Sequence, residues 1–389
     1  MKVEKIPFSE LLSNVVDNRG KTCPTADAGI PLIATNCIRN ELLYPTYDKV
    51  RYVSQETYDT WFRGHPKPGD IIFVNKATPG RVCLVPDPVD FCIAQDMVAV
   101  RADEKKVLPK FLFALLRSPA VQARIEQMHV GTLIPHFKKG DFDNLLLSIP
   151  GREAQEFIGD FYFELSQKID TNRRINETLQ AIAQTLFKSW FIDSTLTKLP
   201  KGWRETTLED AIEIHDSKRI PLSSRERAER KGKIPYHGAA SVMDYVDDYL
   251  FDGVYVLIGE DGSVVNEDNT PVLQYVWGQF WVNNHAHVLS GKNGVSIEHL
   301  FLFLKTVNIR PFVTGAVQPK LNQGNLCRVP FVLPPETICK EFAALIEPMF
   351  ARIRANAEES RTLVELRDAL LPKLLSGELV FSKKKAVKG

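Results

Sequence analysis

The sequence predicts a mixed α/β protein in which one module occurs twice and each copy ends in a long helix. Three observations predict this fold: an internal repeat at constant spacing, β-rich runs with glycine turns beside apolar helices in each half, and about forty residues of helical periodicity closing each half. We therefore expect two globular domains related by pseudo-two-fold symmetry and separated by a pair of long antiparallel coiled-coil helices.

The repeat is clearest in a loop that leads into a helix. The stretch VGTLIPHFKKGDFDNLLLSIP (130–150) matches TGAVQPKLNQGNLCRVPFVLP (314–334), and the same spacing continues without a gap into the helices that follow. Glycines and prolines stay in register, as Gly131 and Gly315 illustrate. Because these residue types mark fixed backbone geometry, their agreement indicates a duplicated module rather than chance.

Upstream, the same frame recurs with different loop lengths. The matching segments are GDIIFVNKATPGRV (69–82) with DGVYVLIGEDGSVV (252–265), GIPLIATN (29–36) with KIPYHGAA (233–240), and LPKFLFALLRS (108–118) with IEHLFLFLKTV (297–307). A repeated frame with divergent loops suits two copies of one scaffold that carry different specificities.

Proline and glycine mark the expected domain junctions. We expect a first domain at 1–150, a central helical region at 151–195, a second domain at 196–335, and a C-terminal helix with a basic tail at 336–389. The first helix should run from about Arg152 to Phe191 and the second from about Glu336 to Leu375, with Gly377 as a plausible stop.

Apolar residues recur in steps of three and four along both helices, which is the pattern of a coiled-coil seam. The expected seam residues are Ile158, Tyr162, Leu165, Ile169, Leu179, Ala183, Leu186 and Trp190 in the first helix, and Phe342, Ile346, Met349, Ile353, Leu363, Leu366, Leu370 and Leu374 in the second. Asn172 and Asn356 interrupt the seam at equivalent positions. If buried near each other, they would fix register; if exposed, they would mark looser pairing.

Composition and motifs exclude several classes of protein. No apolar run is long enough to span a membrane, and the N-terminus has no apolar core of a signal peptide. The sequence contains no phosphate-binding G-x-x-x-x-G-K-[ST] loop, no G-x-G-x-x-G and no Asn/Asp-Pro-Pro-aromatic run, so no nucleotide or methyl-donor site is expected here. The six cysteines fit neither a zinc module nor a disulfide framework, and we expect reduced thiols in a cytoplasmic protein.

Two polar motifs have a structural explanation that outweighs a catalytic one. His285 and His287 project to one side of a predicted strand, but no third ligand is signalled nearby, so no metal site is expected. Glu260 and Asp261 open an acidic turn before Gly262, which is a hairpin signal rather than a nuclease carboxylate pair.

Three segments carry a family resemblance. NRRINETLQAIAQTLFKSWFIDS (172–194) and ELRDALLPKLLSGEL (365–379) resemble the central and C-terminal conserved regions of type I restriction-modification specificity subunits, and IPYHGAASVMDYVDDYLFDGVYVLIGEDGS (234–263) is similar to a target recognition domain of that family. The resemblance implies a non-catalytic subunit whose two domains each read half of a bipartite site in double-stranded DNA.

The resemblance also implies partners that carry the chemistry. Two methyltransferase subunits would dock on the helices and methylate adenine with S-adenosylmethionine, and restriction subunits using ATP and Mg²⁺ would join them. Helices of about forty residues span about 60 Å, more than one DNA turn of roughly 34 Å, so their length would set the unread spacer between the half-sites. A net charge of +1 shows no basic surplus, so we expect weak DNA binding by the chain alone.

Candidate DNA-contacting residues are polar or basic and lie on loops at aligned positions of the two copies. In the first domain they are Asn36, Arg39, Lys76, Arg81, Thr132, His136, Lys138 and Lys139. In the second they are His215, Lys218, Arg219, His237, Ser241, Gln318, Lys320, Asn322 and Gln323. Any one of them alone is more often solvated surface, so the hypothesis rests on the clusters.

Two other classes of protein remain open at this point. A stand-alone methyltransferase or nuclease would need one asymmetric site, which a symmetric duplication without cofactor loops does not favour. A coiled-coil scaffold that ignores DNA would bind no duplex, even with its partners present.

Overall fold

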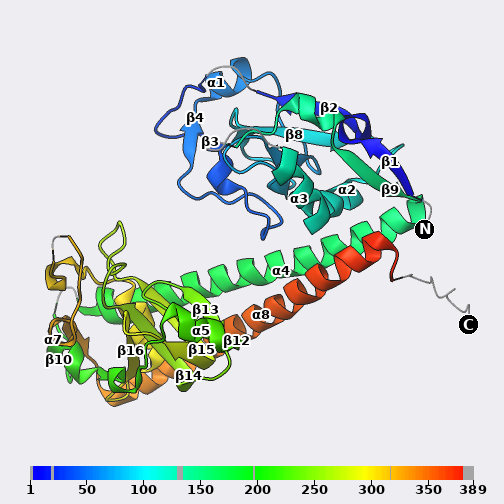
Figure 1. Ribbon diagram of the computed structural model, residues 1–389. Coiled ribbons are helices and arrows are strands. Elements are labelled where there is room, and N and C mark those ends of the chain that lie inside the picture. The colour runs from blue at the N-terminus through cyan, green and yellow to red at the C-terminus, as the bar shows by residue number, and fades with distance from the viewer. Residues whose placement is uncertain (1–2, 19–21, 129–134, 196–197, 316, 380–389) are drawn as a thin grey trace, which may run out of the picture. The chain divides into compact units, whose positions relative to one another are not determined.

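The computed structural model describes residues 3–18, 22–128, 135–195, 198–315 and 317–379 (Figure 1). The chain forms two compact units: unit 1 contains Met1–Arg173 and Glu358–Gly389, and unit 2 contains Arg174–Ala357. Each unit therefore combines one globular domain with one half of each long helix.

The described part of unit 1 is built from short buried strands covered by helices. Its sheets are β1 (Val3–Pro7) with β9 (Leu146–Pro150); β2 (Leu12–Asp17), β8 (Met97–Ala102), β5 (Ile71–Val74) and β6 (Val82–Leu84); and β4 (Arg51–Val53), β3 (Ile30–Ile33) and β7 (Cys92–Ile93). Its short helices are η1 (Phe8–Leu11), η2 (Thr35–Cys37), α1 (Gln55–Thr60), α2 (Pro109–Arg117), α3 (Pro119–Met128) and η3 (Lys139–Asp143). All four residues of β5 are buried, as a continuous β-branched and aromatic run predicts.

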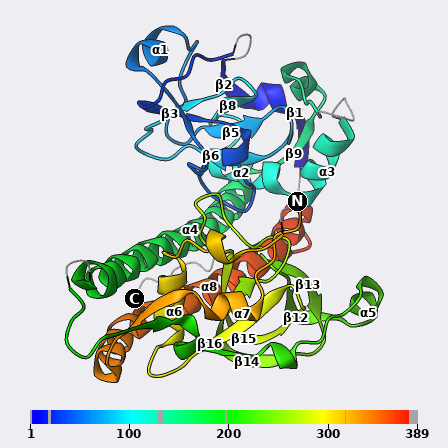
Figure 2. The same ribbon diagram turned by 90° about the vertical axis from the view of Figure 1, so that its left-hand side faces the viewer.

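The described part of unit 2 repeats this plan with longer strands. Its sheets are β10 (Arg204–Thr207) with β17 (Pro330–Leu333), and β11 (Ile212–Ile214), β16 (Ala286–Gly291), β14 (Phe251–Gly259), β15 (Leu273–Val282), β12 (Lys231–His237) and β13 (Val242–Val246). Its short helices are η6 (Leu208–Asp210), η7 (Asp216–Lys218), α5 (Ser224–Glu229), α6 (Ile297–Leu304), η8 (Arg310–Phe312) and α7 (Gln323–Cys327). Figure 2 shows α5 projecting beyond β12 and β13.

Backbone hydrogen bonds confirm the duplication. The Phe8 N–H donates to the Leu145 carbonyl at 2.9 Å, and the Leu208 N–H donates to the Val329 carbonyl at 2.8 Å. The two acceptors, Leu145 and Val329, are equivalent positions of the sequence repeat. The two domains thus share a backbone frame as well as a residue pattern.

The structure corrects the expected alignment in two places. In unit 1, Val74 of β5 pairs with Met97, and in unit 2, Gly259 of β14 pairs with Ala286 at the same place in the sheet. Val74 therefore corresponds to Gly259 and not to Leu257. In unit 1, Arg117 at the end of α2 lies over the Phe113 ring, and in unit 2, Lys305 lies over the Phe301 ring in the same way. Arg117 therefore corresponds to Lys305 and not to Thr306. Loops of different length shift the register locally, and sequence matching alone did not resolve these shifts.

The two predicted long helices are present and run antiparallel within each unit. They are α4 (Arg152–Phe187), which continues into a π-helical turn at Lys188–Ile192, and α8 (Glu336–Ser376). In unit 1 Ser166 contacts Arg367, while Lys168 pairs with Glu359. α8 ends at Gly377, whose φ of 78° and N–H bond to the Leu374 carbonyl form the expected glycine stop.

In unit 2 the antiparallel direction is the same. The Asn176 amide donates to the Ile353 carbonyl at 3.2 Å, and further along α4 the Phe187 ring contacts Phe342. No helix among the described residues is both long enough and apolar enough to cross a membrane.

The asparagines of the seam are buried, which removes the exposed alternative. Asn172 is 0% exposed and Asn356 is 1% exposed. The Asn172 amide donates to Glu359 at 2.8 Å and to Ser360 at 3.3 Å, while the Asn356 amide donates to Asn176 at 2.8 Å. Since Asn176 and Ser360 are themselves equivalent positions of the repeat, each unit contains the same polar pair.

One expected seam residue is placed wrongly by the heptad pattern. Leu366 is 43% exposed, and the neighbouring Arg367 is 5% exposed instead. The Arg367 guanidinium stacks on the Tyr162 ring at 5.2 Å and donates to Ser166 at 3.4 Å. An arginine with an aromatic ring and a hydroxyl acceptor can therefore occupy a position that the apolar pattern assigned to leucine.

Candidate nucleic-acid interface

Two loops of unit 1 are joined by backbone hydrogen bonds into one frame. The Ala77 N–H donates to the Pro135 carbonyl at 3.0 Å, and the Phe137 N–H donates to the Asn75 carbonyl at 2.8 Å. Lys76 and His136 lie directly opposite each other in this pairing. The structure thus brings together two candidates that are far apart in the sequence.

Unit 2 contains the same frame. The Gly262 N–H donates to the Pro319 carbonyl at 3.1 Å, the Leu321 N–H donates to the Glu260 carbonyl at 2.8 Å, and Asp261 lies opposite Lys320. We call these paired loops the clamp of each unit: residues 75–77 with 135–137 in unit 1, and 260–262 with 319–321 in unit 2.

The clamps share a left-handed turn residue. Ala77 has φ of 69° and Gly262 has φ of 74°. Such a conformation favours glycine, and unit 1 adopts it with alanine, so the turn is constrained by the hydrogen bonds on either side of it.

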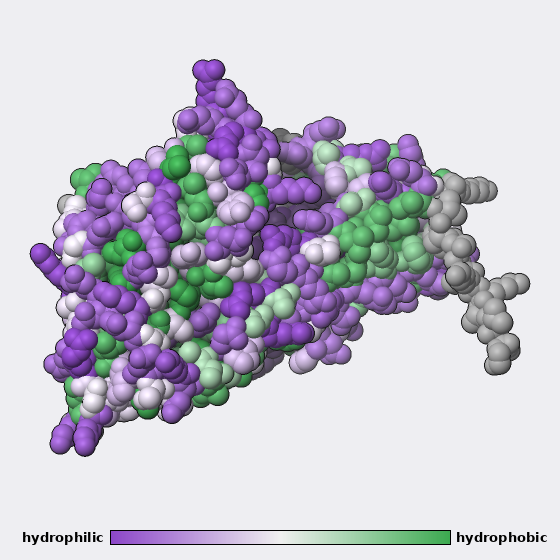
Figure 3. All heavy atoms as spheres, turned by 90° about the horizontal axis from the view of Figure 1, so that it is seen from below, coloured by the Kyte–Doolittle hydropathy of each residue, from purple (hydrophilic) through white to green (hydrophobic). Residues whose placement is uncertain are grey.

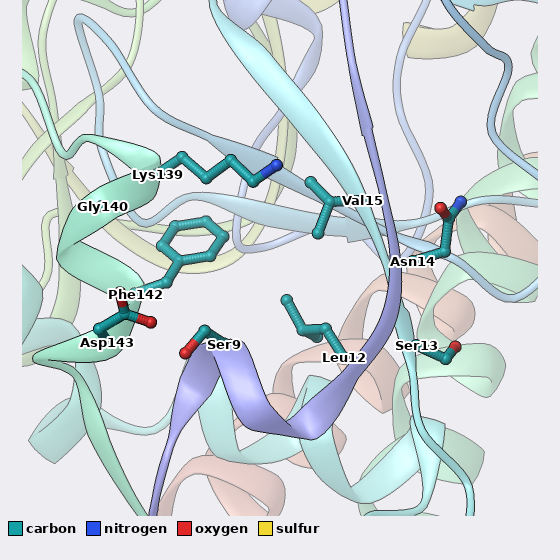
Figure 4. A pocket seen from close by; sticks show the side chains of 9 residues that line it. All are labelled: Ser9, Leu12, Ser13, Asn14, Val15, Lys139, Gly140, Phe142 and Asp143. Atoms are coloured by element: carbon teal, nitrogen blue, oxygen red, sulfur yellow. The ribbon is translucent and has the colours of Figure 1, made fainter.

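Beside the clamp of unit 1, Lys138 and Lys139 are exposed, and neither forms a side-chain ion pair with another described residue. Lys139 lines a hollow together with Ser9, Leu12 and Phe142. Figure 4 shows its side chain reaching across this hollow toward Val15. An extended, solvated ammonium group of this kind suits contact with a phosphate.

The other candidates of unit 1 are bound more closely to the domain. The Asn36 amide donates to the Asp48 carbonyl at 2.7 Å, and Arg39 pairs with the Asp48 carboxylate at 3.1 Å. Lys76 lies 3.9 Å from Asp96, and Arg81 is half-buried. The candidate Thr132 lies outside the described residues.

In unit 2 a charge network lies directly under the clamp. Arg219 donates to Glu260 at 2.7 Å and lies 3.3 Å from Asp216, and its side chain is only 12% exposed. The Gln323 amide donates to Asp216 at 2.6 Å. Arg219 therefore supports the loops from within, whereas Gln323 is an exposed residue whose amide is held by Asp216. Lys320, 53% exposed and 3.9 Å from Glu260, faces solvent.

His287 completes this network. Its Nδ1 lies 2.5 Å from the Asp216 carboxylate and its Nε2 lies 2.7 Å from the Leu321 carbonyl. Burial raises the pKa of Asp216, but hydrogen bonds from His287, Val288 and Gln323 outweigh it and leave the pKa lowered. The carboxylate is therefore charged and joins β16, through His287 and Val288, to α7, through Gln323.

Asp216, Glu260 and His287 could in principle hold a metal, because their ligand atoms lie within 4.8 Å of one another. The Arg219 guanidinium, however, already pairs with both carboxylates, and both ring nitrogens of His287 face acceptors. The geometry is that of a paired ion network rather than of a metal centre.

The remaining candidates of unit 2 differ in accessibility. His215 shares a hydrogen bond of 2.7 Å with Ser290, and Asn322 accepts from the Asn325 N–H as the N-cap of α7. His237 is 7% exposed and hydrogen-bonds Gln274, and burial lowers its pKa. Its side chain is therefore packed inside the domain and is not presented on the surface. The exposed candidates are Lys218, Ser241 and Gln318.

Sequence reasoning missed two tyrosines that occupy one position of the repeat. Tyr52 of edge strand β4 lies opposite Pro31 of β3, and Tyr245 of edge strand β13 lies opposite Pro235 of β12. They are 36% and 51% exposed. The shared Tyr-Val dipeptides, 52–53 and 245–246, are the signal that could have found them, but they lie further apart than equivalent positions of the main repeat.

Comparison with known proteins places this fold in a family. Residues 15–181 and 200–365 each match the family model described as type I restriction modification DNA specificity domain. The MjaIX type I restriction enzyme specificity subunit of Methanocaldococcus jannaschii is 24% identical over 392 residues, which covers 90% of this chain and 87% of that protein. A putative type I specificity subunit of Haemophilus influenzae, S.HindORF215P, is 33% identical over 161 residues, 41% of this chain and 40% of that protein.

A solved structure agrees in fold. The crystal structure of the type I restriction-modification S subunit from M. genitalium superposes with a TM-score of 0.56 at 18% identity, covering 96% of each chain. Because the family model matches most of the sequence in two tandem copies, the chain belongs to the type I restriction-modification specificity subunits, the non-catalytic DNA-specificity components of these enzymes.

Proposed function

We propose that the domain of each unit reads one half of a bipartite DNA sequence and that the clamp presents its reading residues. The observation that carries the proposal is the recurrence of the same backbone frame with different polar side chains at and beside it: His136 and Lys139 in one unit stand where Lys320 and Gln323 stand in the other. A constant frame with variable polar side chains suits two different half-sites.

We further propose that partner subunits perform all chemistry. Two methyltransferase subunits would supply S-adenosylmethionine-dependent adenine methylation, and restriction subunits would supply ATP- and Mg²⁺-dependent cleavage. A reader of chromosomal DNA works in the cytoplasm, where the six unpaired cysteines of the chain would stay reduced.

The helices offer two equivalent docking positions for such partners. Ile182 on α4 and Leu366 on α8 are equivalent positions of the repeat, and each is 43% exposed. One belongs to unit 2 and the other to unit 1. Figure 3 shows apolar side chains gathered on the surface in the right-hand part of the view. Among the apolar residues of unit 1, Leu366 and Phe157 are exposed. Equivalent apolar positions favour two copies of one partner.

Helix length would set the spacer between the half-sites. α4 contains 36 residues and α8 contains 41. At about 1.5 Å per residue, helices of this size exceed a DNA turn of roughly 34 Å. We therefore propose a target with several unread base pairs between its two read halves.

Methylome sequencing of cells with and without this chain tests the proposal directly. We expect adenine methylation at one two-part motif to disappear when the chain is absent, because the methyltransferase has lost its reader. Purified chain incubated with S-adenosylmethionine alone should methylate nothing. An unchanged methylome, or methylation by the chain alone, contradicts the proposal.

The two lysines beside the clamp of unit 1 can be tested through salt dependence. Replacing Lys138 and Lys139 by Ala should weaken DNA binding by the assembled methyltransferase and flatten the slope of log K against log salt by about 0.9 per lost phosphate contact. The control replaces Lys105 and Lys106 by Ala, which removes the same charge from the same unit. Equal affinity of wild type and the Lys138/Lys139 variant at several salt concentrations would remove these residues from the interface.

The two tyrosines should contribute in a different way. We expect Tyr52→Ala and Tyr245→Ala each to weaken specific binding about tenfold, because exposed aromatic rings contact bases, while the salt slope stays unchanged. Tyr52→Phe and Tyr245→Phe serve as controls and should retain most of the affinity. A loss that varies steeply with salt, or no loss, would show that the rings do not touch bases.

Partner stoichiometry tests the helix positions. Ile182→Asp and Leu366→Asp should each reduce the complex from two methyltransferase subunits to one, as measured by native mass spectrometry, because a buried aspartate opposes docking. Met243→Asp, at a residue 56% exposed on β13, should leave two copies bound. Two copies on both helix variants would place the docking surface elsewhere.

A further inference from the structure

Unit 2 encloses a cavity of about 360 Å³ at the end of α4. Its walls are aromatic, formed by Phe187 at the end of α4, by Phe191 in the turn that follows, by Phe303 of α6 and by Phe331 of β17. The polar residues Glu205, Thr206 and Thr306 complete the lining. The volume falls within the range of pockets that bind small molecules, about 300–1,000 Å³.

One buried polar side chain lines this aromatic cavity. His299 is 1% exposed, and its ring lies 4.3 Å from the Phe191 ring and 5.5 Å from the Phe342 ring. Its Nδ1 has no hydrogen-bond partner among the described residues. Buried polar groups in proteins are nearly always hydrogen-bonded, so an unpaired nitrogen in the wall of a cavity offers a contact to a molecule that enters the cavity.

The histidine is neutral. Burial lowers the pKa of His299 to about 3, which leaves one ring nitrogen as a donor and the other as an acceptor at physiological pH. A neutral imidazole between phenylalanine rings favours a ligand that is itself flat and uncharged.

The repeat shows that the fold does not require a histidine here. Since Phe113 of α2 corresponds to Phe301 of α6, the counterpart of His299 in unit 1 is Phe111, which is 0% exposed. The domain therefore packs with phenylalanine at this position in one copy. Packing alone therefore does not explain why unit 2 has the polar His299 at the position that Phe111 fills in unit 1.

We propose that this cavity binds a planar aromatic ring carrying one N–H or O–H group, with the ring among the phenylalanines and the polar group on the His299 imidazole. The ring can come from a free small molecule or from a tryptophan or tyrosine side chain of a partner protein. This site is separate from the clamp and extends the function proposed above.

Indole and indene form a matched pair of probes, because they differ in the N–H group and hardly in size. Titration calorimetry with the full chain should show that indole binds at least tenfold more tightly than indene, since a site with an unpaired polar atom rejects a ligand that cannot bond it. In His299→Phe, which copies the packing at Phe111, the ratio should fall to about one.

Two further variants control this experiment. His65→Phe makes the same change at a half-buried histidine of unit 1 whose Nδ1 is also without a partner, and it should leave indole binding unchanged. Phe303→Trp narrows the cavity while keeping His299 and should weaken binding of both probes. Thermal melts establish that each variant is folded.

The source of the ring follows from repeating the indole titration on the chain assembled with its methyltransferase partners. Loss of indole binding there supports a partner side chain in the cavity, whereas retained binding supports a free ligand. The proposal is overturned if folded wild-type chain binds indole no better than indene, or if His299→Phe keeps the preference.

Discussion

The antiparallel contact of α4 with α8 is the interaction on which both units depend, because each globular core is completed by residues of both helices. Ile158 of α4 and Leu371 of α8 belong to the core of unit 1. Phe187 of α4 and Phe342 of α8 belong to the core of unit 2. Neither domain can therefore bury its apolar surface without both halves of the chain. The buried Asn172 strengthens this dependence, since a polar group sealed in an apolar seam tolerates only the register that satisfies it.

The backbone frame that the two domains share explains how they can present different surfaces. The clamp is built from main-chain groups, for example the Ala77 N–H and the Pro135 carbonyl, which are independent of side-chain identity. The side chains beside it can therefore differ between the two copies, as Lys139 and Gln323 do at one position of the repeat. Unit 2 adds a buried charge network around Asp216 that unit 1 does not need, because Val98 stands where His287 stands, at the matching position of β8. Specificity can thus vary at the surface while the frame persists.

Sequence alone predicted the duplication, both long helices and the glycine stop at Gly377, because these depend on local geometry and on residue periodicity. It missed features that depend on contacts between distant residues. The burial of Arg219 follows from Asp216 and Glu260, and Glu260 lies in the loop after β14, far from Arg219 in the sequence. The sequence alignment of the clamp was out of register because one copy uses Ala77 where the other has glycine. The paired tyrosines were missed because unequal loops change the spacing of the repeat.

The near-zero net charge of a DNA-specificity subunit also has a structural explanation. Three guanidinium groups of unit 2 are paired with carboxylates: Arg219 with Glu260 and Arg227 with Asp244 in largely buried pairs, and Arg230 with Asp247 nearer the surface. These arginines hold loops and hairpins in place, so they contribute little to attracting phosphates. Lys139 and the other solvated lysines at or beside the clamps carry only a small part of the positive charge that a DNA-binding surface usually has. We therefore propose that tight binding draws on positive charge from partner subunits, so that recognition depends on assembly of the whole enzyme.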